Sequence, residues 1–450
     1  QVESRAQMAM LPRLRPKNFY DLVVEVALVR PGPIQGDMVH PYLKRRQGKE
    51  RLEKISPAVD AVLARTFGVP IFQEQVMQLA VVAANFTPGE ADQLRRAMAA
   101  WKRKGGLEPF EQKLLAGMAA NGLPESFARR IIAQIQGFGE YGFPESHAAS
   151  FALLVYASAW LKRHHPAAFL CALLNSQPMG FYSPSMLVQD ARRHGVGVLP
   201  PDVTTSDWDC RLEPTGAVRL GLREINGFTK AAADRIVAVD RKNRPFFDVA
   251  DLAARASLQR RDLDLLAAAD ALLSLAGHRR QAAWAASAAL VQGDLFAGVM
   301  APEAPANLPI PSEAENLIGD YQHLKLTLGR HPLSLLREHL TARRFVSAAE
   351  LKIAEHRTPI RAAGIVVGRQ RPGTATGIVF VTLEDESGLV NIVVHPQLIE
   401  KQRRELLGAT LLGVYGQLQK DGEVVHLVAK RLVDLSSWLG RLETHSRDFH

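Results

Sequence analysis

Residues 360–367 read Ile-Arg-Ala-Ala-Gly-Ile-Val-Val, and residues 378–383 read Ile-Val-Phe-Val-Thr-Leu. Both stretches are rich in β-branched residues and follow the two-residue period of strands. Three further stretches of this kind follow, at residues 390–394, 410–418 and 424–433. A helical segment at residues 396–407 lies between the third strand and the fourth. The C-terminal part is therefore predicted to form a small β-barrel of five strands.

Five strands with one helix between the third and the fourth is the layout of an OB-fold, and a different small barrel is the alternative. OB-folds that bind single-stranded DNA stack its bases on aromatic side chains. Phe380 and Tyr415 are the only aromatic residues in the five predicted strands. We therefore expect the barrel to bind single-stranded DNA weakly.

The part of the chain that precedes the barrel is predicted to be mainly helical. Apolar residues recur at helical spacing in segments 19–29, 70–85, 90–101, 108–120, 124–136 and 146–164. Short helices return between residues 222 and 275, and an Ala-, Pro- and Glu-rich linker occupies residues 297–312. The predicted fold class is a multidomain protein, mainly α-helical and followed by a small OB-fold barrel. Its predicted divisions are residues 1–172, a connector at 173–205, a hairpin region at 206–285, a motif-bearing linker at 286–345, the barrel at 346–435 and a tail at 436–450.

Composition limits the class of protein. The 450 residues are 47% hydrophobic and 22% charged, the balance of a globular protein, and no apolar run is long enough to cross a membrane. Cys171 and Cys210 are the only cysteines, too few for a disulfide framework, which indicates a reducing, cytoplasmic compartment. The chain opens on Gln1 within a helical pattern, so we expect it to be a piece of a longer protein.

The charge favours a polyanionic partner. Lys and Arg number 55 against 46 Asp and Glu, which gives a formal net charge of +9. Basic surfaces bind nucleic acids because neutralised phosphates release counterions. The general Arg content of a protein from a GC-rich genome is the alternative. Most basic clusters lie in the first third of the chain or near a hairpin, which favours nucleic acid.

One basic run lies on and just after a predicted helix. Residues 94–98 (Leu-Arg-Arg-Ala-Met) are followed by Lys102, Arg103 and Lys104, and the run contains no acid. Arg suits bidentate phosphate contacts, and Lys supplies a point charge. The run is predicted to hold a triphosphate or a nucleic-acid backbone. A solvated helix face is the alternative.

A loop with two aromatic residues leads into a later helix. Residues 141–147 read Tyr-Gly-Phe-Pro-Glu-Ser-His, and Ser146 is predicted to cap the helix with His147 in its first turn. Exposed amides at a helix start suit an anion. A capping loop whose aromatic residues lie in the core is the alternative.

Residues 220–228 (Leu-Gly-Leu-Arg-Glu-Ile-Asn-Gly-Phe), followed by a helix, resemble a helix-hairpin-helix element. The amides of such a turn, here those of Asn226, Gly227 and Thr229, bind a DNA phosphate without reading sequence. Thr229 stands where a second glycine is usual, which weakens the case for that contact. Four basic residues are predicted to add DNA contacts, namely Arg235, Arg241, Lys242 and Arg244. A purely structural hairpin is the alternative.

Two shorter motifs complete the candidates. Residues 292–296 (Gln-Gly-Asp-Leu-Phe) resemble the pentapeptide that docks bacterial replication proteins on the sliding clamp, and a chance match is the alternative. Its predicted contact residues are Gln292, Asp294, Leu295 and Phe296. Asp207 and Asp209 could mimic the carboxylates of a two-metal site, but they lie in a strand-poor connector, and we predict no metal site in this chain.

Taken in order, these segments resemble one family, the C-family bacterial replicative polymerases of the DNA polymerase III α subunit type. The matching stretches are residues 2–5, 27–33, 73–77, 94–98, 141–143, 146–152 and 199–202. Residues 446–450, which follow the barrel closely, resemble the error-prone branch of the ImuC type. The resemblance implies that residues 1–172 are most of the fingers, followed by the helix-hairpin-helix region, the clamp motif and the OB-fold.

The resemblance also implies roles for single residues. In the family, the pair at Arg95 and Arg96 contacts the triphosphate of the incoming dNTP, with the basic residues 102–104 assisting or touching primer-template DNA. The residues implied to shape the nucleotide pocket are Arg5, Arg30, Tyr141, Gly142, Ser146 and His147. Pro144-Glu145 stands where Asn-Lys is usual, and Trp101 where Gly is usual.

The family's Mg²⁺-binding palm aspartates precede the stretch that matches residues 2–5, so the resemblance implies that they lie outside this chain. We therefore expect a DNA-directed DNA polymerase of damage-induced translesion synthesis as the full-length protein, and no nucleotide incorporation by this piece alone. A non-catalytic module that binds DNA and docks on the sliding clamp is the alternative. An ImuB-type accessory protein is a further implied partner, and no membrane contact is expected.

Overall fold

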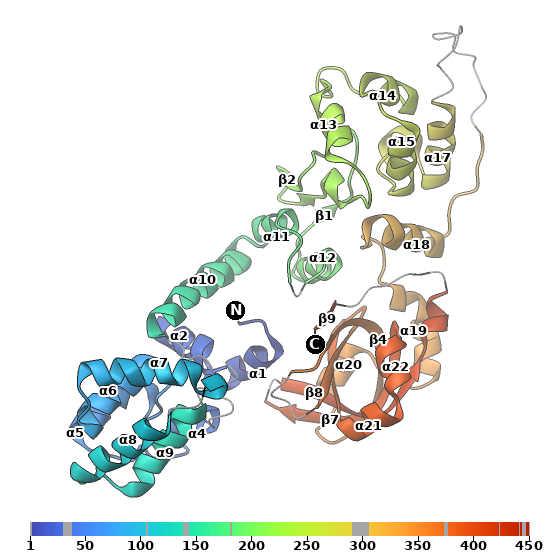
Figure 1. The fold of residues 1–450 in the computed structure, drawn as a ribbon. Helices are drawn as coiled ribbons and strands as arrows, with labels where there is room; N and C mark the ends of the chain where they lie inside the picture. The colour runs from blue at the N-terminus through green and yellow to red at the C-terminus, as the bar shows by residue number, and fades with distance from the viewer. Residues whose placement is uncertain are drawn as a thin grey trace. The chain divides into compact units, whose positions relative to one another are not determined.

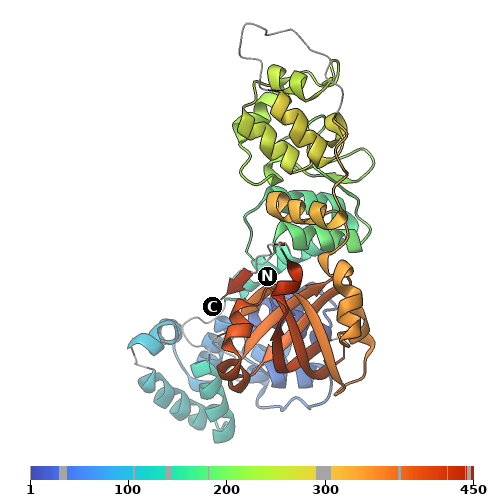
Figure 2. The same ribbon diagram turned by 90° about the vertical axis from the view of Figure 1, so that its right-hand side faces the viewer.

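The computed structural model describes residues 2–29, 38–104, 107–137, 144–180, 182–289, 306–372, 377–422, 424–440, 442 and 447–449. The chain divides into two compact units, whose elements are labelled in Figure 1 and seen from a second side in Figure 2. Unit 1 comprises Gln1–Trp160 with the short segment Gly422–Val424. Unit 2 comprises Leu161–Asp421 and Val425–His450.

Unit 1 is built from helices, as the sequence predicts. Several starts are fixed by polar caps: the side chains of Ser4, Asn18 and Ser56 each accept a hydrogen bond from a backbone N–H three residues on. The helices are α1 (Arg5–Leu14), α2 (Phe19–Leu28), α4 (Val39–Arg46), α5 (Pro57–Leu63), η1 (Ala64–Thr66), α6 (Gln73–Ala84), α7 (Pro88–Lys104), α8 (Glu108–Ala120), α9 (Glu125–Gly137) and α10 (Glu145–His164).

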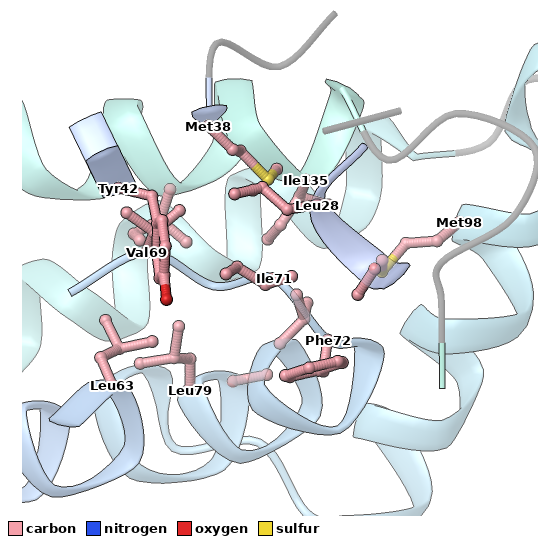
Figure 3. Packing of buried hydrophobic residues seen from close by; sticks show 14 of the residues in the cluster. Leu28, Met38, Tyr42, Leu63, Val69, Ile71, Phe72, Leu79, Met98 and Ile135 are labelled. Atoms are coloured by element: carbon pink, nitrogen blue, oxygen red, sulfur yellow. The ribbon is translucent and has the colours of Figure 1, made fainter. Parts of the chain in front are cut away.

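One apolar core joins these helices (Figure 3). Tyr42, Ile71, Phe72 and Leu79 all lie in it, and each of the four is at most 1% exposed. Gln75 is the polar centre of this region. Its Oε1 accepts hydrogen bonds from the N–H groups of residues 71 and 72, and its Nε2 donates to backbone and hydroxyl oxygens of the α5–η1 segment. A buried amide whose donors and acceptor are all used fixes the start of α6 without a desolvation penalty.

Unit 2 begins with a helical region that holds the predicted hairpin. Its elements are α11 (Pro166–Asn175), α12 (Pro184–Arg193), β1 (Val198–Leu199), β2 (Arg211–Leu212), β3 (Val218–Arg219), η2 (Leu222–Glu224), α13 (Lys230–Ala238), α14 (Val249–Arg255), α15 (Arg260–Ala268), α16 (Leu273–Ala276) and α17 (Arg279–Ala288). The three short strands form a sheet in the order β1-β3-β2. The predicted division at residue 172 falls inside α11, whose Leu170 and Leu174 pack into the core of unit 2.

Three helices lead into the barrel, α18 (Glu313–Leu324), α19 (Pro332–Ala342) and α20 (Ala348–Ile353). The first two form where a linker was expected to continue to residue 345. The reason is local, because Ser312 and Glu315 form a capping box before α18, and Pro332 stands at the first position of α19. Arg337 of α19 bonds Asp385 and Glu386 at the tip of a barrel hairpin, which fixes the helix against the sheet.

The barrel confirms the predicted OB-fold. Its strands are β4 (Pro359–Gln370), β5 (Val379–Asp385), β6 (Gly388–Val394), β7 (Leu411–Asp421) and β8 (Val424–Asp434), in the order β5-β6-β8-β7-β4. The long β4 pairs with β7 along its first half and with β5 along its second, which closes the ring. A register shift between Val366 and Gly368 lets the strand turn from one partner to the other.

Two details of the barrel differ from the prediction. The expected helix at residues 396–407 is two short helices, α21 (Pro396–Lys401) and α22 (Arg403–Gly408). It breaks at Gln402, whose side-chain amide exchanges two hydrogen bonds of 2.8 Å with the backbone of Leu432 on β8. In the expected tail, β9 (Arg447–Phe449) pairs in parallel with β4.

None of the described helices has the length and apolar character needed to span a bilayer.

Candidate nucleic-acid interface

The arginine pair lies on the outer face of α7. Leu94 and Met98 of this helix are buried in the core of unit 1, so the helical period turns Arg95 and Arg96 away from it. The Arg95 side chain is 36% exposed and that of Arg96 is 74% exposed. Both guanidinium groups are therefore within reach of a ligand from solvent.

Asp92 binds both of these guanidinium groups. Arg95 donates to Asp92 Oδ1 through Nε at 3.0 Å and Nη2 at 2.9 Å, and Arg96 Nη2 lies 2.8 Å from Asp92 Oδ2. The hydrogen bond from Arg95 is the main reason that the pKa of the Asp92 carboxyl is lowered. The run from residue 94 contains no acid, but Asp92, two residues before it, supplies a counter-charge to both arginines that was not predicted.

Glu145 anchors the start of α10. Its Oε1 accepts a hydrogen bond of 2.8 Å from the Tyr20 hydroxyl, and Arg65 Nη1 lies 3.4 Å from the same oxygen. The Arg65 guanidinium in turn lies 3.7 Å from the centroid of the Tyr20 ring. Glu145 therefore joins α10 to α2 and η1.

Ser146 does not cap α10, and that prediction is wrong. The helix begins at Glu145, whose backbone N–H donates to Glu74 Oε2 at 2.9 Å. A carboxylate from α6 thus takes the place of the expected hydroxyl cap and complements the helix dipole. Ser146 and His147 lie in the first turn with exposed side chains, and the His147 ring packs 4.7 Å from that of Phe151.

Several predicted site residues fall outside the described part of the chain. These are Arg30, Tyr141 and Gly142 of the implied nucleotide pocket, and Gln292, Asp294, Leu295 and Phe296 of the clamp motif. The backbone of Arg5 lies at the start of α1, and that of Lys102, Arg103 and Lys104 lies at the end of α7; their side chains are not described.

The predicted hairpin lies between η2 and α13. Gly227 turns the chain with a φ of +79°, and within the described residues no acceptor is bonded to its N–H. The Asn226 N–H donates to the His323 carbonyl at 2.7 Å, so the prediction that this amide binds phosphate is wrong. Thr229 is the N-cap of α13, its hydroxyl accepting from the Ala232 N–H, which explains how the hairpin forms without a second glycine.

Two of the four basic residues predicted to bind DNA near the hairpin are used within the protein. Arg235 Nε donates to the Ala256 carbonyl at 3.0 Å, and its Nη2 bonds Asp262. The Arg241 side chain is 12% exposed and donates to Asp207 and to two backbone carbonyls of the preceding connector. The Arg235 guanidinium links α13 to the end of α14 and to α15, and the Arg241 guanidinium links the loop after α13 to the loop after β1.

The other two basic residues, Lys242 and Arg244, are exposed in the loop between α13 and α14. A residue that the sequence analysis missed lies nearer to the turn. A β-carbon placed on Gly227 would lie 4.0 Å from Nη2 of Arg261, which is exposed on the first turn of α15. Arg261 follows the hairpin glycine by 34 positions, so no sequence spacing links the two.

The Asp-x-Asp pair is engaged by arginines. Asp207 bonds Arg211 at 2.9 Å and also Arg241, and Asp209 bonds Arg223 at 2.7 Å. Over the described ranges, no three His, Cys, Asp or Glu side chains are grouped in a way that could hold a metal ion.

Three family models match the chain, in the order that the sequence predicts. Residues 1–122 match the bacterial DNA polymerase III alpha subunit finger domain. Residues 195–282 match a helix-hairpin-helix motif, and residues 360–435 match an OB-fold nucleic acid binding domain. The first match covers α7 with its arginine pair, and the second covers the turn at Gly227.

Curated relatives match along the whole chain. It is 84% identical to the error-prone DNA polymerase of Dechloromonas aromatica and 65% identical to that of Azoarcus, with 100% of this chain aligned in each case. The corresponding Pseudomonas aeruginosa protein is 60% identical. The chain spans less than half of these relatives, 44%, 43% and 44% of their respective lengths. Along its whole length this chain is therefore similar to bacterial error-prone DNA polymerases, and its first 122 residues match the finger domain of the bacterial DNA polymerase III alpha subunit.

Proposed function

We propose that this chain is the nucleotide- and DNA-binding portion of an error-prone DNA polymerase, which extends a primer along a DNA template and copies past damage. The observation that carries the proposal is the 84% identity, over all 450 residues, to a protein named error-prone DNA polymerase. The succession of a finger domain, a helix-hairpin-helix motif and an OB-fold supports it.

In this proposal, α7 receives the triphosphate of the incoming dNTP. Arg95 and Arg96 stand side by side on the exposed face of the helix, and two guanidiniums can neutralise the charge of a phosphoryl group in transfer. Asp92 orients both groups before the ligand arrives. The basic residues 102–104 continue the same helix toward the DNA. The other implied pocket residues are Arg5, Arg30, Tyr141, Gly142, Ser146 and His147.

The hairpin region is proposed to hold the DNA backbone. The Gly227 N–H and the exposed Arg261 beside it offer one donor and one cation to a phosphate. Lys242 and Arg244 add exposed positive charge in the loop after α13. Contacts of this kind fix DNA without reading its sequence.

Polymerases transfer nucleotides with divalent metal ions, and the family resemblance implies Mg²⁺ on palm aspartates. The donor set of this chain does not fit such a site, because the described residues contain no group of three metal-ligating side chains and Asp207 and Asp209 are held by arginines. The chain alone is proposed to bind DNA but to incorporate no nucleotide.

The triphosphate role is tested in the full-length polymerase that contains this chain. Arg95→Ala combined with Arg96→Ala should raise the Kd for dNTP at least tenfold in pre-steady-state incorporation, and an unchanged Kd would refute the role. The matched control is Arg129→Ala with Arg130→Ala, a second adjacent pair on α9 whose members bond Glu125 and Glu53. This control should leave the Kd for dNTP unchanged.

The DNA role is tested with the chain itself. It should bind a primer-template duplex with an affinity that falls steeply as salt rises, and it should extend no primer in the presence of Mg²⁺ and dNTPs. Template-directed extension by residues 1–450 would show that the catalytic carboxylates lie in this chain after all.

Docking on a sliding clamp through Gln292, Asp294, Leu295 and Phe296 remains a proposal that rests on the sequence. Leu295→Ala with Phe296→Ala should abolish binding to the clamp in a pull-down with purified proteins. Unchanged binding would mean that the pentapeptide matches by chance. An ImuB-type accessory protein also remains a proposed partner, and this proposal rests on the family resemblance alone.

A further inference from the structure

One aromatic side chain stands exposed in the loop between α13 and α14. Phe247 is 85% exposed, more than any other large hydrophobic side chain of the described residues. Its neighbour Phe246 is 6% exposed and lies in the core of the hairpin region. Single exposed apolar residues are common on protein surfaces, so the way the Phe247 backbone is held and the charges around it decide whether its ring can bind a ligand.

The loop that carries Phe247 is fixed against α14. The Arg255 guanidinium donates to the backbone carbonyls of residues 244–245, at 2.7 and 3.2 Å. The Phe247 N–H donates to Asp251 Oδ2 at 3.1 Å. The Arg255 guanidinium also lies 4.7 Å from the centroid of the Phe246 ring. Because the backbone that leads into Phe247 is held in this way, little conformational entropy is lost when its ring meets a ligand.

Two exposed cations lie beside the ring. Lys242 and Arg244 belong to the same loop, and neither forms an ion pair in the part of the chain that the structure describes. The three carboxylates of residues 240–251 each accept hydrogen bonds within the protein, namely Asp240, Asp248 and Asp251. The loop therefore presents an apolar ring next to positive charge that solvent can reach.

We propose that Phe247 stacks on an unpaired base of DNA, with Lys242 and Arg244 on the phosphates beside that base. The proposal rests on the DNA-binding function proposed above and adds a base contact to the backbone contacts of the hairpin region, whose matched residues include Phe247. A nucleotide combines a flat apolar face with a negative charge, and every base offers such a face to an aromatic ring. The base must be unpaired, because stacked neighbours cover the faces of paired bases.

The ring lies within reach of DNA that is bound at the hairpin. The helix α13 separates the turn at Gly227 from the loop of Phe247, and its nine residues span about 14 Å. This length corresponds to about four phosphates along one strand of a duplex. A primer-template junction presents paired and unpaired nucleotides within such a distance, so the Gly227 N–H can hold a phosphate of the duplex while Phe247 meets the overhang.

The test measures the affinity of the whole chain for a primer-template whose template strand has a single-stranded overhang. Phe247→Ala should raise the Kd about tenfold, because a base stacked on an aromatic side chain contributes to binding on this scale. Phe247→Trp should keep the affinity, and Phe247→Leu, which is apolar but has no ring, should lose it as Ala does. The matched control is Trp284→Ala on α17, which removes another exposed aromatic side chain and should leave the Kd unchanged.

An abasic site moved along the overhang locates the contacted base. At one position it should weaken binding by the wild type about tenfold and binding by Phe247→Ala little further, because the ring and the base form a single contact. Lys242→Gln with Arg244→Gln should lower the slope of log K against log salt by about 1.4, the value for two phosphate contacts on a single strand.

An unchanged Kd in Phe247→Ala would overturn the inference, as would an equal loss on a blunt duplex that has no unpaired base. Full affinity in Phe247→Leu would also overturn it, because an apolar contact with a protein or a sugar needs no ring. Where Phe247→Ala melts at a lower temperature than the wild type, the comparison of the Trp and Leu variants decides. If the wild type binds primer-template and Phe247→Ala binds it equally well, this inference fails and the proposed function stands; a wild type that binds no DNA would refute the proposed function itself.

Discussion

Replacing Glu25 by Gln is expected to remove a pH-dependent loss of stability from unit 1. Glu25 lies on α2 with 0% exposure, and none of the described residues provides a hydrogen-bond partner for either carboxylate oxygen. Burial raises the pKa of Glu25 from 4.5 to about 8. The side chain is therefore protonated in the folded protein at pH 7, because an unpaired charge in the core would cost more than holding the proton.

The magnitude follows from the two pKa values. The folded state keeps the proton up to pH about 8, whereas the unfolded state releases it near pH 4.5. The contribution to stability is therefore complete below pH 4.5 and decreases by about 1.4 kcal/mol per pH unit until the pH reaches the folded pKa. Between pH 5.5 and 7.5, Glu25 should lower the free energy of unfolding by about 3 kcal/mol. Gln cannot ionise, so the variant should show no such decrease.

Hydrogen exchange of peptides from α2 and α6, read by mass spectrometry and corrected for intrinsic rates, isolates unit 1 from titrating groups elsewhere in the chain. The matched control is Asp21→Asn on the same helix. Burial pushes the pKa of Asp21 up, but hydrogen bonds from Arg46 and the Lys17 backbone outweigh it and lower the pKa. The stability that Asp21 provides is lost only as the pH falls through that lowered pKa, so this variant should shift protection equally at pH 5.5 and 7.5. Equal slopes in the wild type and Glu25→Gln would refute the reasoning.

Three further changes test other contacts. Thr229→Ala removes the N-cap of α13 and should destabilise unit 2 by about 1 kcal/mol in urea denaturation, with Thr229→Ser close to the wild type. Gly117→Ala would place a β-carbon 2.2 Å from the Ala84 carbonyl oxygen, so α6 and α8 must move apart, and thermal melting should report a loss of about 1–3 kcal/mol. Arg241→Ala leaves two buried carbonyls without a donor and should cost about 1–3 kcal/mol, while the salt slope of DNA binding stays unchanged; a lower slope would identify Arg241 as a DNA contact.

The barrel could be predicted because its information is local. Alternating apolar residues and turn signals place each strand within a few residues of its observed ends. The break at Gln402 could not be predicted in this way, since its cause is a pair of hydrogen bonds to Leu432, 30 positions later. The helices α18 and α19, which lie within the predicted linker division 286–345, are a different case. Ser312 and Glu315 form a capping box that the sequence displays, and the Ala- and Pro-rich composition before it concealed the signal.

In the candidate site too, contacts between residues close in sequence could be predicted, and contacts between distant residues could not. Asp92 precedes Arg95 and Arg96 by three and four positions, which is a helical spacing, so this contact was available from the sequence. The hydrogen bonds from Arg241 to the carbonyls of Val203 and Ser206, 38 and 35 positions earlier, could not be predicted from the sequence. The stacking of Arg361 and Arg431 on Tyr415 could not be predicted either, because only the closure of the barrel brings these three residues together.

These contacts rank the arginines by how readily each can meet a phosphate. Arg241 is nearly buried and bonds three oxygens, so releasing it would leave buried carbonyls unsatisfied at a cost that a surface phosphate contact does not recover. Arg96 is exposed and Arg95 is partly exposed, and because solvent screens their ion pairs with Asp92, these pairs add little to stability and a triphosphate can displace the carboxylate. Arg431 forms no ion pair with any carboxylate of the described residues and stacks on Tyr415. A basic residue next to a DNA-binding motif is therefore weak evidence of DNA contact until its partners within the protein are known. The net charge of +9 indicates DNA binding only through those cations that solvent can reach.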